Sequence, residues 1–284
     1  ESGREFFGHF SRFSMGSDVA DINNDGHLDL AIANHETSHI SLLLGKGDGS
    51  FSAASHSPLK INVNPHPHVV RLVDLDGDNN VDLIIDSRSN NGLLVLKGLG
   101  NGDFNNPGVI VNGGGDPYRG FAIGDINRDG HLDLVTPNQR DIGILLNSGD
   151  SALSFKLNKL PQPESPFAVE LADLDGDGNL DLITTSNGTL ATVFPGDGRG
   201  NFLENNKTEF KVSRGAKQIA TGDINGDGIE DALISSWSGE SVAIIGDKST
   251  LALTAIKHAK IANPWGIAIL DLNKDGKSDF VIGD

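Results

Sequence analysis

The chain has 284 residues, no cysteine and a formal net charge of −17, from 22 Lys and Arg against 39 Asp and Glu. The absence of cysteine excludes disulfides, the absence of an apolar run of about 18 residues argues against a membrane-spanning helix, and the absence of a basic stripe argues against nucleic acid as a partner. The 36 glycines are typical of turn-rich β-structure.

A nine-residue pattern, D-x-[DN]-x-D-[GN]-x-x-D, occurs six times along the chain. Successive copies begin 48 to 53 residues apart, which indicates an array of small repeats that bury their apolar faces against one another. The copies span residues 21–29, 74–82, 125–133, 173–181, 223–231 and 271–279.

The pattern has the chemistry of a calcium loop. Ca²⁺ is a hard cation that takes about six to eight oxygen ligands, and positions 1, 3, 5 and 9 carry only Asp or Asn. Position 7 varies freely, which suits a backbone carbonyl ligand, and position 6 is Gly or Asn, which adopt a left-handed backbone at least cost. The sequence therefore predicts about six Ca²⁺ sites, one per repeat.

The expected side-chain ligands at positions 1 and 3 are Asp21, Asp74, Asp125, Asp173, Asp223, Asp271, Asn23, Asp76, Asn127, Asp175, Asn225 and Asn273. Those at positions 5 and 9 are Asp25, Asp78, Asp129, Asp177, Asp227, Asp275, Asp29, Asp82, Asp133, Asp181, Asp231 and Asp279. The expected carbonyl ligands at position 7 belong to His27, Asn80, His131, Asn179, Ile229 and Lys277.

Two other structures could carry this pattern. An EF-hand needs a Glu at position 12 and flanking helices, but position 12 is Ile or Thr here, and the segments after the loops alternate and are rich in β-branched residues, which predicts strands. Six acidic turns without an ion are the other alternative. The charge favours the ion, because six divalent cations add +12 to −17 and leave −5.

Each repeat can be laid out as four short strands. In the second repeat these are expected at residues 67–75, 81–87, 92–100 and 107–113, with the calcium loop between the first two. Residues 40–51, 142–150 and 191–202 match the third strand and its turn in other repeats. Four strands in about 50 residues are typical of a propeller blade. We therefore expect an all-β, six-bladed β-propeller, with seven blades as the alternative, in a single domain of residues 1–284.

The last repeat is expected to be completed by the N-terminus. Its second strand ends near residues 280–284, whereas residues 3–6 resemble the end of the turn after a third strand and residues 6–14 take the place of a fourth. The third strand has no counterpart, and such a gap could accept a strand from a partner.

The string DINNDGHLDLAIANHETSHISLLLGKGDGSF at residues 21–51 resembles the FG-GAP (also called VCBS) repeat of integrin α-subunit propellers and of many secreted bacterial and fungal proteins. The resemblance covers essentially the whole chain. It implies a calcium-stabilised β-propeller with the calcium loops on one face and partner-binding loops on the other. Repeats five and six depart from the pattern, because Glu230 and Ser278 replace an apolar residue at position 8 and residues 246–253 lack the G-x-G-D-G-x-F turn.

On the face opposite the calcium loops, residues six positions before each loop are expected to form a ring. Aromatic platforms with polar neighbours suit sugar rings or protein hot spots; the alternative is that these aromatics plug the channel or pack between blades. The candidate ligand-binding residues are His68, Tyr118, Arg119, Phe167, Lys217, Trp237 and Trp265, and Met15 completes the ring.

The expected function is a non-catalytic binding or adhesion module with lectin-like carbohydrate recognition, and no catalytic residue is predicted. An accessory propeller in protein–protein assembly is the alternative, and a polysaccharide lyase or hydrolase the third. The partner is then a carbohydrate or a protein. Calcium loops suit the calcium-rich extracellular space, so we expect a secreted or cell-surface protein.

Two further groups of residues have the composition of a metal site or a catalytic site. Residues 35–39 read H-E-T-S-H, but a zincin needs both histidines on one helix face, and this string is expected in a turn between strands. His35 and His39 could instead form a surface transition-metal site with His66 and His68. Glycosidase chemistry would need two close carboxylates, for which the candidates are Glu36, Asp86, Asp116, Asp141, Glu164 and Glu240.

Overall fold

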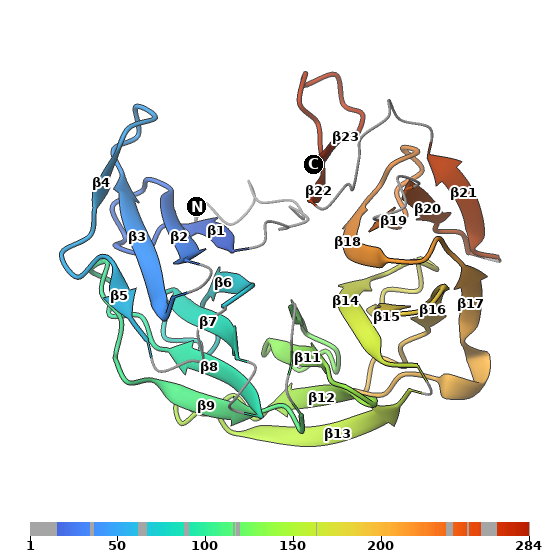
Figure 1. Cartoon of the computed structure of the whole chain (residues 1–284), viewed down its shortest axis with the longest axis horizontal. Coiled ribbons are helices and arrows are strands. Elements are labelled where there is room, and N and C mark those ends of the chain that lie inside the picture. The colour runs from blue at the N-terminus through green and yellow to red at the C-terminus, as the bar shows by residue number, and fades with distance from the viewer. Residues whose placement is uncertain are drawn as a thin grey trace. The chain divides into compact units, whose positions relative to one another are not determined.

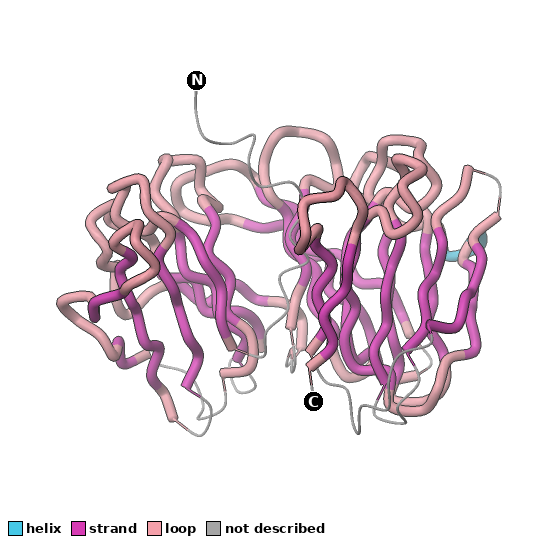
Figure 2. Tube along the Cα trace, turned by 90° about the horizontal axis from the view of Figure 1, so that it is seen from above, coloured by secondary structure: helices cyan, strands magenta, loops and turns pink. Residues whose placement is uncertain are grey.

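The computed structural model describes residues 16–34, 37–61, 67–87, 91–115, 117, 120–162, 164–236, 241–248, 250–256 and 266–283. These residues form β-strands apart from loops and the short 3-10 helix η2 (Glu204–Asn206). The chain divides into two compact units, a first unit of Ser14–Pro163 and a second unit whose described residues run from 164 to 283. In both units the strands run between loops at their two ends (Figure 2).

The first unit contains three blades, each an antiparallel sheet whose strands follow one another in chain order (Figure 1). Blade 1 consists of β1 (Ser17–Ala20), β2 (Asp29–Asn34), β3 (His39–Gly45), β4 (Phe51–Ala53) and β5 (Leu59–Lys60), which also pairs with β3. Blade 2 consists of β6 (Val70–Val73), β7 (Asp82–Ser87), β8 (Gly92–Leu96) and β9 (Val109–Asn112). Blade 3 consists of β10 (Ala122–Gly124), β11 (Asp133–Pro137), β12 (Asp141–Asn147) and β13 (Phe155–Pro161).

The second unit contains two blades of the same order and a two-stranded sheet. Blade 4 consists of β14 (Pro166–Ala172), β15 (Asp181–Ser186), β16 (Leu190–Phe194) and β17 (Thr208–Lys211). Blade 5 consists of β18 (Ala216–Gly222), β19 (Asp231–Ser236), β20 (Ser241–Ile245) and β21 (Ala252–Ile256). The two-stranded sheet pairs β22 (Ile267–Leu270) with β23 (Asp279–Ile282).

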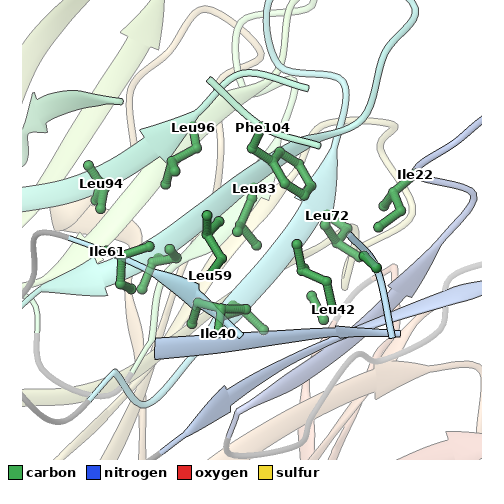
Figure 3. Close-up of a cluster of buried hydrophobic side chains, with 14 residues drawn as sticks. Ile22, Ile40, Leu42, Leu59, Ile61, Leu72, Leu83, Leu94, Leu96 and Phe104 are labelled. Atoms are coloured by element: carbon green, nitrogen blue, oxygen red, sulfur yellow. The ribbon is translucent and has the colours of Figure 1, made fainter. Parts of the chain in front are cut away.

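The core of the first unit lies between its blades. Successive side chains of a strand point to opposite faces, and in β7 Leu83 and Ile85 pack with Ile40 of blade 1 (Figure 3). Ile84, between them, packs with Leu134 of blade 3. All five side chains are fully buried. A middle blade thus buries both faces, which explains why its strands are continuous apolar runs.

The second unit is built in the same way. Ile183 of blade 4 shares a buried cluster with Ile219 of blade 5. Leu233 of blade 5 then packs against Ile269 of β22. The described neighbours of β23 cover it less well, since Val281 is 45% exposed.

The structure confirms the all-β propeller fold but not the number of blades. The described residues form five blades of four or more strands, where six were predicted with seven as the alternative. The sixth repeat contributes only β22 and β23, because its third and fourth strands have no counterpart among the described residues. The predicted closure by the N-terminal segment concerns residues 3–14, which lie outside the described residues. The single-domain assignment stays a prediction.

The second repeat shows how close the predicted strands are. Each predicted range contains an observed strand that is shorter at one or both ends, and the range 81–87 loses only its first residue. None of the helical segments in the described part of the chain could span a lipid bilayer.

Candidate metal centre

Each nine-residue loop is wrapped around its first carboxylate. In the fourth loop, Asp173 accepts N–H bonds from Asp177 (3.1 Å) and Gly178 (2.9 Å). Asp175 accepts the N–H of Asp177 at 3.1 Å, and Asp177 accepts that of Asn179 at 2.8 Å. The same hydrogen bonds recur in all six loops, so the nine residues dictate the turn themselves.

Two positions of the loop adopt a left-handed backbone. Position 6 does so as predicted, for example Gly26 with φ of 86° and Asn79 with φ of 68°. Position 4 does so as well, although it is Asn24, Arg128 and Lys274 in three of the loops, with φ of 59°, 61° and 61°. This second left-handed position was missed, because Arg and Lys carry no signal for it.

Two loops bring three carboxylates together. The ligand atoms of each group lie within 4.8 Å of one another, and the groups are Asp74, Asp76 and Asp78, and Asp173, Asp175 and Asp177. Two oxygens that both bind Ca²⁺ at about 2.3–2.6 Å are at most about 5 Å apart, so this spacing fits the ion. In the other loops position 3 is Asn, whose amide oxygen is a neutral ligand of the same hard type.

The carboxylate at position 9 clamps the loop to the blade. Asp82 accepts the N–H of Leu75 at 2.9 Å with one oxygen and that of Gly98 at 2.9 Å with the other. Equivalent pairs of bonds are made by Asp29, Asp133, Asp181 and Asp231. Neither acidic group includes position 9. The structure therefore shows this carboxylate as an anchor, and its role as a ligand stays a prediction.

Burial raises the pKa of these anchor carboxyls. It takes the pKa of Asp82 and of Asp133 to about 6 and that of Asp181 to about 7, although the backbone N–H bonds act in the opposite direction. The pKa values of Asp29 and Asp231 are raised for the same reason. A divalent cation beside such a carboxyl would favour its charged form.

A glycine after the third strand completes the clamp, and its role was missed from the sequence. A Cβ on Gly98 would lie 2.1 Å from the carbonyl oxygen of Val81, at position 8 of the loop. The same contact, at 2.1–2.2 Å, is found at Gly45, Gly196 and Gly246. Blade 3 has Asn147 instead, and its side-chain amide donates to the carbonyls of Leu132 (3.1 Å) and Leu75 (3.0 Å). The recurrence of a glycine at the end of the third strand in four repeats was the sequence signal that could have revealed this contact.

The first and fourth loops are also supported by the following blade of the same unit. Gly102 in blade 2 donates its N–H to the carbonyl of Ile22, at position 2 of the first loop, at 3.1 Å. Asp247 in blade 5 donates to Leu174, at the same position of the fourth loop, at 3.0 Å. A well-ordered loop therefore stabilises the contact between blades.

The two departures at position 8 are explained by contacts of this kind. Glu230 accepts the N–H of Asp173 at 3.1 Å, and Ser278 donates its hydroxyl to the carbonyl of Asp223 at 2.5 Å. Each polar residue thus connects its own loop to the preceding loop.

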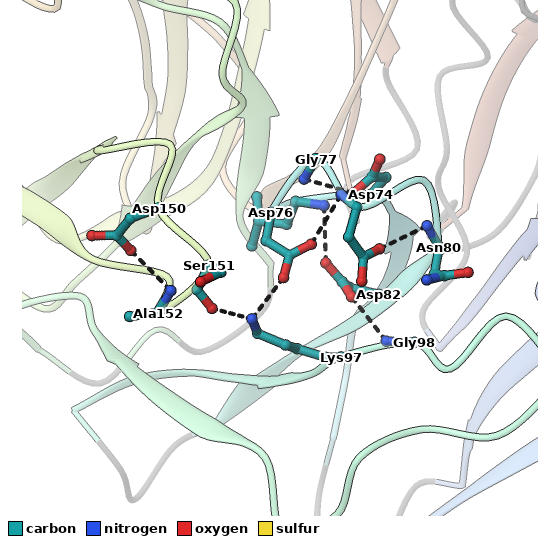
Figure 4. Close-up of polar contacts among 12 residues, drawn as sticks. Asp74, Asp76, Gly77, Asn80, Asp82, Lys97, Gly98, Asp150, Ser151 and Ala152 are labelled. Atoms are coloured by element: carbon teal, nitrogen blue, oxygen red, sulfur yellow. Dashed lines mark hydrogen bonds and ion pairs between the residues drawn. The ribbon is translucent and has the colours of Figure 1, made fainter.

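The second loop carries a cation of the protein itself. The ammonium of Lys97 lies 2.6 Å from Asp76 Oδ2 and also donates to the carbonyl of Ser151 in blade 3 (Figure 4). Lys97 directly precedes Gly98, whose N–H is bound by Asp82.

Few of the candidate ligand-binding residues are described. His68 is 6% exposed, and its N–H donates to Asp86 at 2.8 Å. Phe167 is 7% exposed and belongs to the cluster between blades 4 and 5, and Lys217 lies in β18. The structure thus places Phe167 in the core. The remaining candidates lie outside the described residues, namely Met15, Tyr118, Arg119, Trp237 and Trp265.

The other sequence motifs are only partly described. In the H-E-T-S-H string, His39 begins β3, whereas His35, Glu36 and His66 lie outside the described residues.

Three of the six candidate carboxylates are described, and all three have structural partners. Asp86 accepts N–H bonds, Asp141 pairs with Lys159 at 3.0 Å, and Glu164 accepts a hydroxyl at 2.6 Å. Glu36, Asp116 and Glu240 lie outside the described residues.

Three solved structures with a similar fold are distant from this chain in sequence. Two of them are crystal structures of BBS1N in complex with ARL6DN. The form soaked with lead matches with a TM-score of 0.55 and 14% sequence identity, over 83% of this chain and 62% of that chain. The form soaked with mercury matches with a TM-score of 0.51 and 12% sequence identity, over 86% of this chain and 66% of that chain. The periplasmic gluconolactonase PpgL of Pseudomonas aeruginosa matches at 0.57 and 14% identity over 92% and 71%. The present chain thus spans about two thirds or less of the BBS1N chains. At these identities the likeness is one of fold.

Comparison with curated proteins gave no sequence match. A family model described as FG-GAP-like repeat matches residues 21–85, 74–136 and 173–234, which together make up more than half of the chain. Its matched segments contain five of the six nine-residue loops and all or most of each strand that follows them. The chain therefore belongs to the FG-GAP-like repeat family.

Proposed function

We propose that this chain is a calcium-binding β-propeller that serves as a non-catalytic binding module outside the cell. The observation that carries the calcium assignment is that all six loops share one set of hydrogen bonds, and in two of them three carboxylates lie within 4.8 Å of one another. Such a group repels itself unless a cation is bound. About six Ca²⁺ ions, one per loop, would balance most of the charge of −17.

Bound calcium would also hold neighbouring blades together. The ion would fix the oxygens at positions 1, 3 and 5, and position 2 of the same loop accepts an N–H from the next blade at Ile22 and Leu174. An ordered loop therefore preserves the contact between blades, and ligands that bind only the folded state raise its stability.

For the binding function, lectin-like recognition of a carbohydrate is our first proposal and protein–protein assembly the second. BBS1N, which shares the fold, is found in a complex with ARL6DN, a case that favours a protein partner. PpgL, which also shares the fold, is a gluconolactonase, so the fold alone does not decide between binding and catalysis. Because Phe167 is buried, a binding surface would depend mainly on Tyr118, Arg119, Trp237 and Trp265.

A glycan array in calcium buffer tests the lectin proposal. The protein should bind a defined class of glycan, and Trp265→Ala should abolish that binding while leaving calcium content and melting temperature nearly unchanged. Phe167→Ala is the matched control. It should lower the melting temperature, because truncation of a core aromatic reduces the free energy of unfolding by about 3–5 kcal/mol.

Three results would contradict the proposal. Glycan binding that survives Trp265→Ala would remove this tryptophan from the site. No glycan binding, together with capture of a defined protein partner, would replace the lectin proposal by protein assembly. Turnover of a polysaccharide panel or of gluconolactone would show that the module is catalytic.

A further inference from the structure

The second and fourth loops offer the same ligands in different surroundings. Their side chains at positions 1, 3, 5, 7 and 9 are identical, Asp-Asp-Asp-Asn-Asp in both, and both bring three carboxylates together. They differ in the residue that precedes the clamping glycine, which is Lys97 beside the second loop and Pro195 beside the fourth.

Lys97 is held on the carboxylate group of the second loop. Its backbone is fixed by the adjacent Gly98, whose N–H donates to Asp82 at 2.9 Å. Its ammonium lies 2.6 Å from Oδ2 of Asp76, a side chain only 3% exposed, and it donates a second bond to the carbonyl of Ser151. An ion pair so deeply placed is screened far less than one on the surface.

The fourth loop has a lysine nearby but no equivalent ion pair among the described residues: Cε of Lys248 lies 3.4 Å from the place that a Cβ on Gly176 would take. In the described part of the chain, Asp175 has no Lys or Arg within ion-pair distance. Asp76 and Asp175 occupy the same position of the same ligand set, so the two loops form a matched pair within one molecule.

We propose that Lys97 competes with a divalent cation for Asp76, so that the second loop binds Ca²⁺ more weakly than the fourth. The inference rests on the proposed calcium function and adds an order of filling to it. A Ca²⁺ ion bound about 2.4 Å from a carboxylate oxygen of Asp76 would lie close to the ammonium, and two cations at that distance repel each other. Calcium therefore enters the second loop only as the ammonium moves away, which also releases its bond to blade 3.

Calorimetric titration of the whole chain with Ca²⁺ tests this order. We expect wild type to show at least one site weaker than the rest, and Lys97→Met to tighten one site by about tenfold or more, since the repulsion between two close cations at a partly buried site is then removed. Lys97→Arg, which keeps the charge, should leave that site weak. Adding Asp78→Asn to Lys97→Met should abolish the tightened site and so assign it to the second loop.

Lys159→Met is the matched control, because its ion pair with Asp141 lies on no calcium loop. It should leave every calcium affinity unchanged. If wild type binds Ca²⁺ but Lys97→Met leaves all affinities unchanged or weakens one, the inference is wrong while the calcium function stands. If wild type binds no Ca²⁺, both are wrong. Melting without calcium gives a separate readout: Lys97→Met should lower the melting temperature, because the three carboxylates then lose their cation.

Discussion

The first five nine-residue loops and the sixth have the same local hydrogen bonds but different surroundings. In the fifth loop Asp231 is buried and accepts the N–H of Ile224 and that of Gly246 after the third strand. In the sixth loop Asp279 is partly exposed and, within the described residues, accepts only the N–H of Leu272. The nine residues therefore dictate the turn, whereas burial and clamping come from the rest of the blade.

The comparison predicts that calcium matters most where the loop is clamped and buried. Removal of Ca²⁺ with a strong chelator should produce the largest effect of all, because each ion present at about 100 times its Kd contributes about 2.7 kcal/mol to the free energy of unfolding. The melting temperature should fall by about 10 °C or more. Differential scanning calorimetry with and without calcium measures this, with Mg²⁺ as the control cation; equal melting temperatures would disprove the stabilising role.

The clamp itself can be broken at matched positions of the two kinds of loop. Asp181→Ala leaves the buried N–H groups of Leu174 and Gly196 without an acceptor, at a cost of about 2–4 kcal/mol. Asp279→Ala exposes one N–H group to water and should cost less than about 1 kcal/mol. Urea unfolding in chelator compares the two. Equal losses would show that the clamp adds nothing to the loop.

The buried carboxyls at position 9 should make the stability of the calcium-free chain depend on pH. Burial raises the pKa of Asp82 and Asp133 to about 6 and that of Asp181 to about 7 in the folded, calcium-free chain, above the ordinary value of 3.8. The folded state then binds more protons than the unfolded state, so this contribution to stability is present at low pH and is lost as pH rises from about 4 to 7.

Calcium requires the charged carboxylates, so its contribution has the opposite sign. The difference between the melting temperatures with and without Ca²⁺ should therefore widen from pH 5 to pH 8. Melting curves at each pH test this, and a difference that shrinks as pH rises would contradict the assignment.

The contact between consecutive loops should give the smallest effect. Glu230→Leu removes the acceptor of the Asp173 N–H and should cost about 0.5–1.5 kcal/mol. Glu230→Gln, which keeps an acceptor oxygen, is the control and should be close to wild type in urea unfolding. Equal losses in both variants would mean that the charge, and not the hydrogen bond, matters.

The sequence was a good guide to features that depend on neighbouring residues. The loop turn and the strands after it follow from the spacing of aspartates and the alternation of side chains, as β7 shows at residues 82–87. The position-6 conformation of Gly26 and Asn79 followed from residue type in the same way. In each case the signal lies within about ten residues of the structure it predicts.

The sequence was a poor guide to features that depend on distant residues. The clamp joins Asp82 to Gly98, and the ion pair joins Asp76 to Lys97, 21 positions along the chain. Glu230 departs from the apolar residue expected at position 8 of the repeat, and the sequence did not reveal that its carboxylate accepts an N–H from the preceding loop. The number of blades depended on strand pairing in the sixth repeat, where the described residues provide two strands only.

Calcium binding by the six loops can be measured as the number of Ca²⁺ ions bound to each chain, by mass spectrometry of metals after gel filtration in calcium buffer. We expect about six Ca²⁺ per wild-type chain, one for each loop. Asp177→Asn, which removes a carboxylate from the fourth loop, should lower the count by one. A folded wild-type chain that retains no calcium, or a count unchanged by Asp177→Asn, would contradict this expectation.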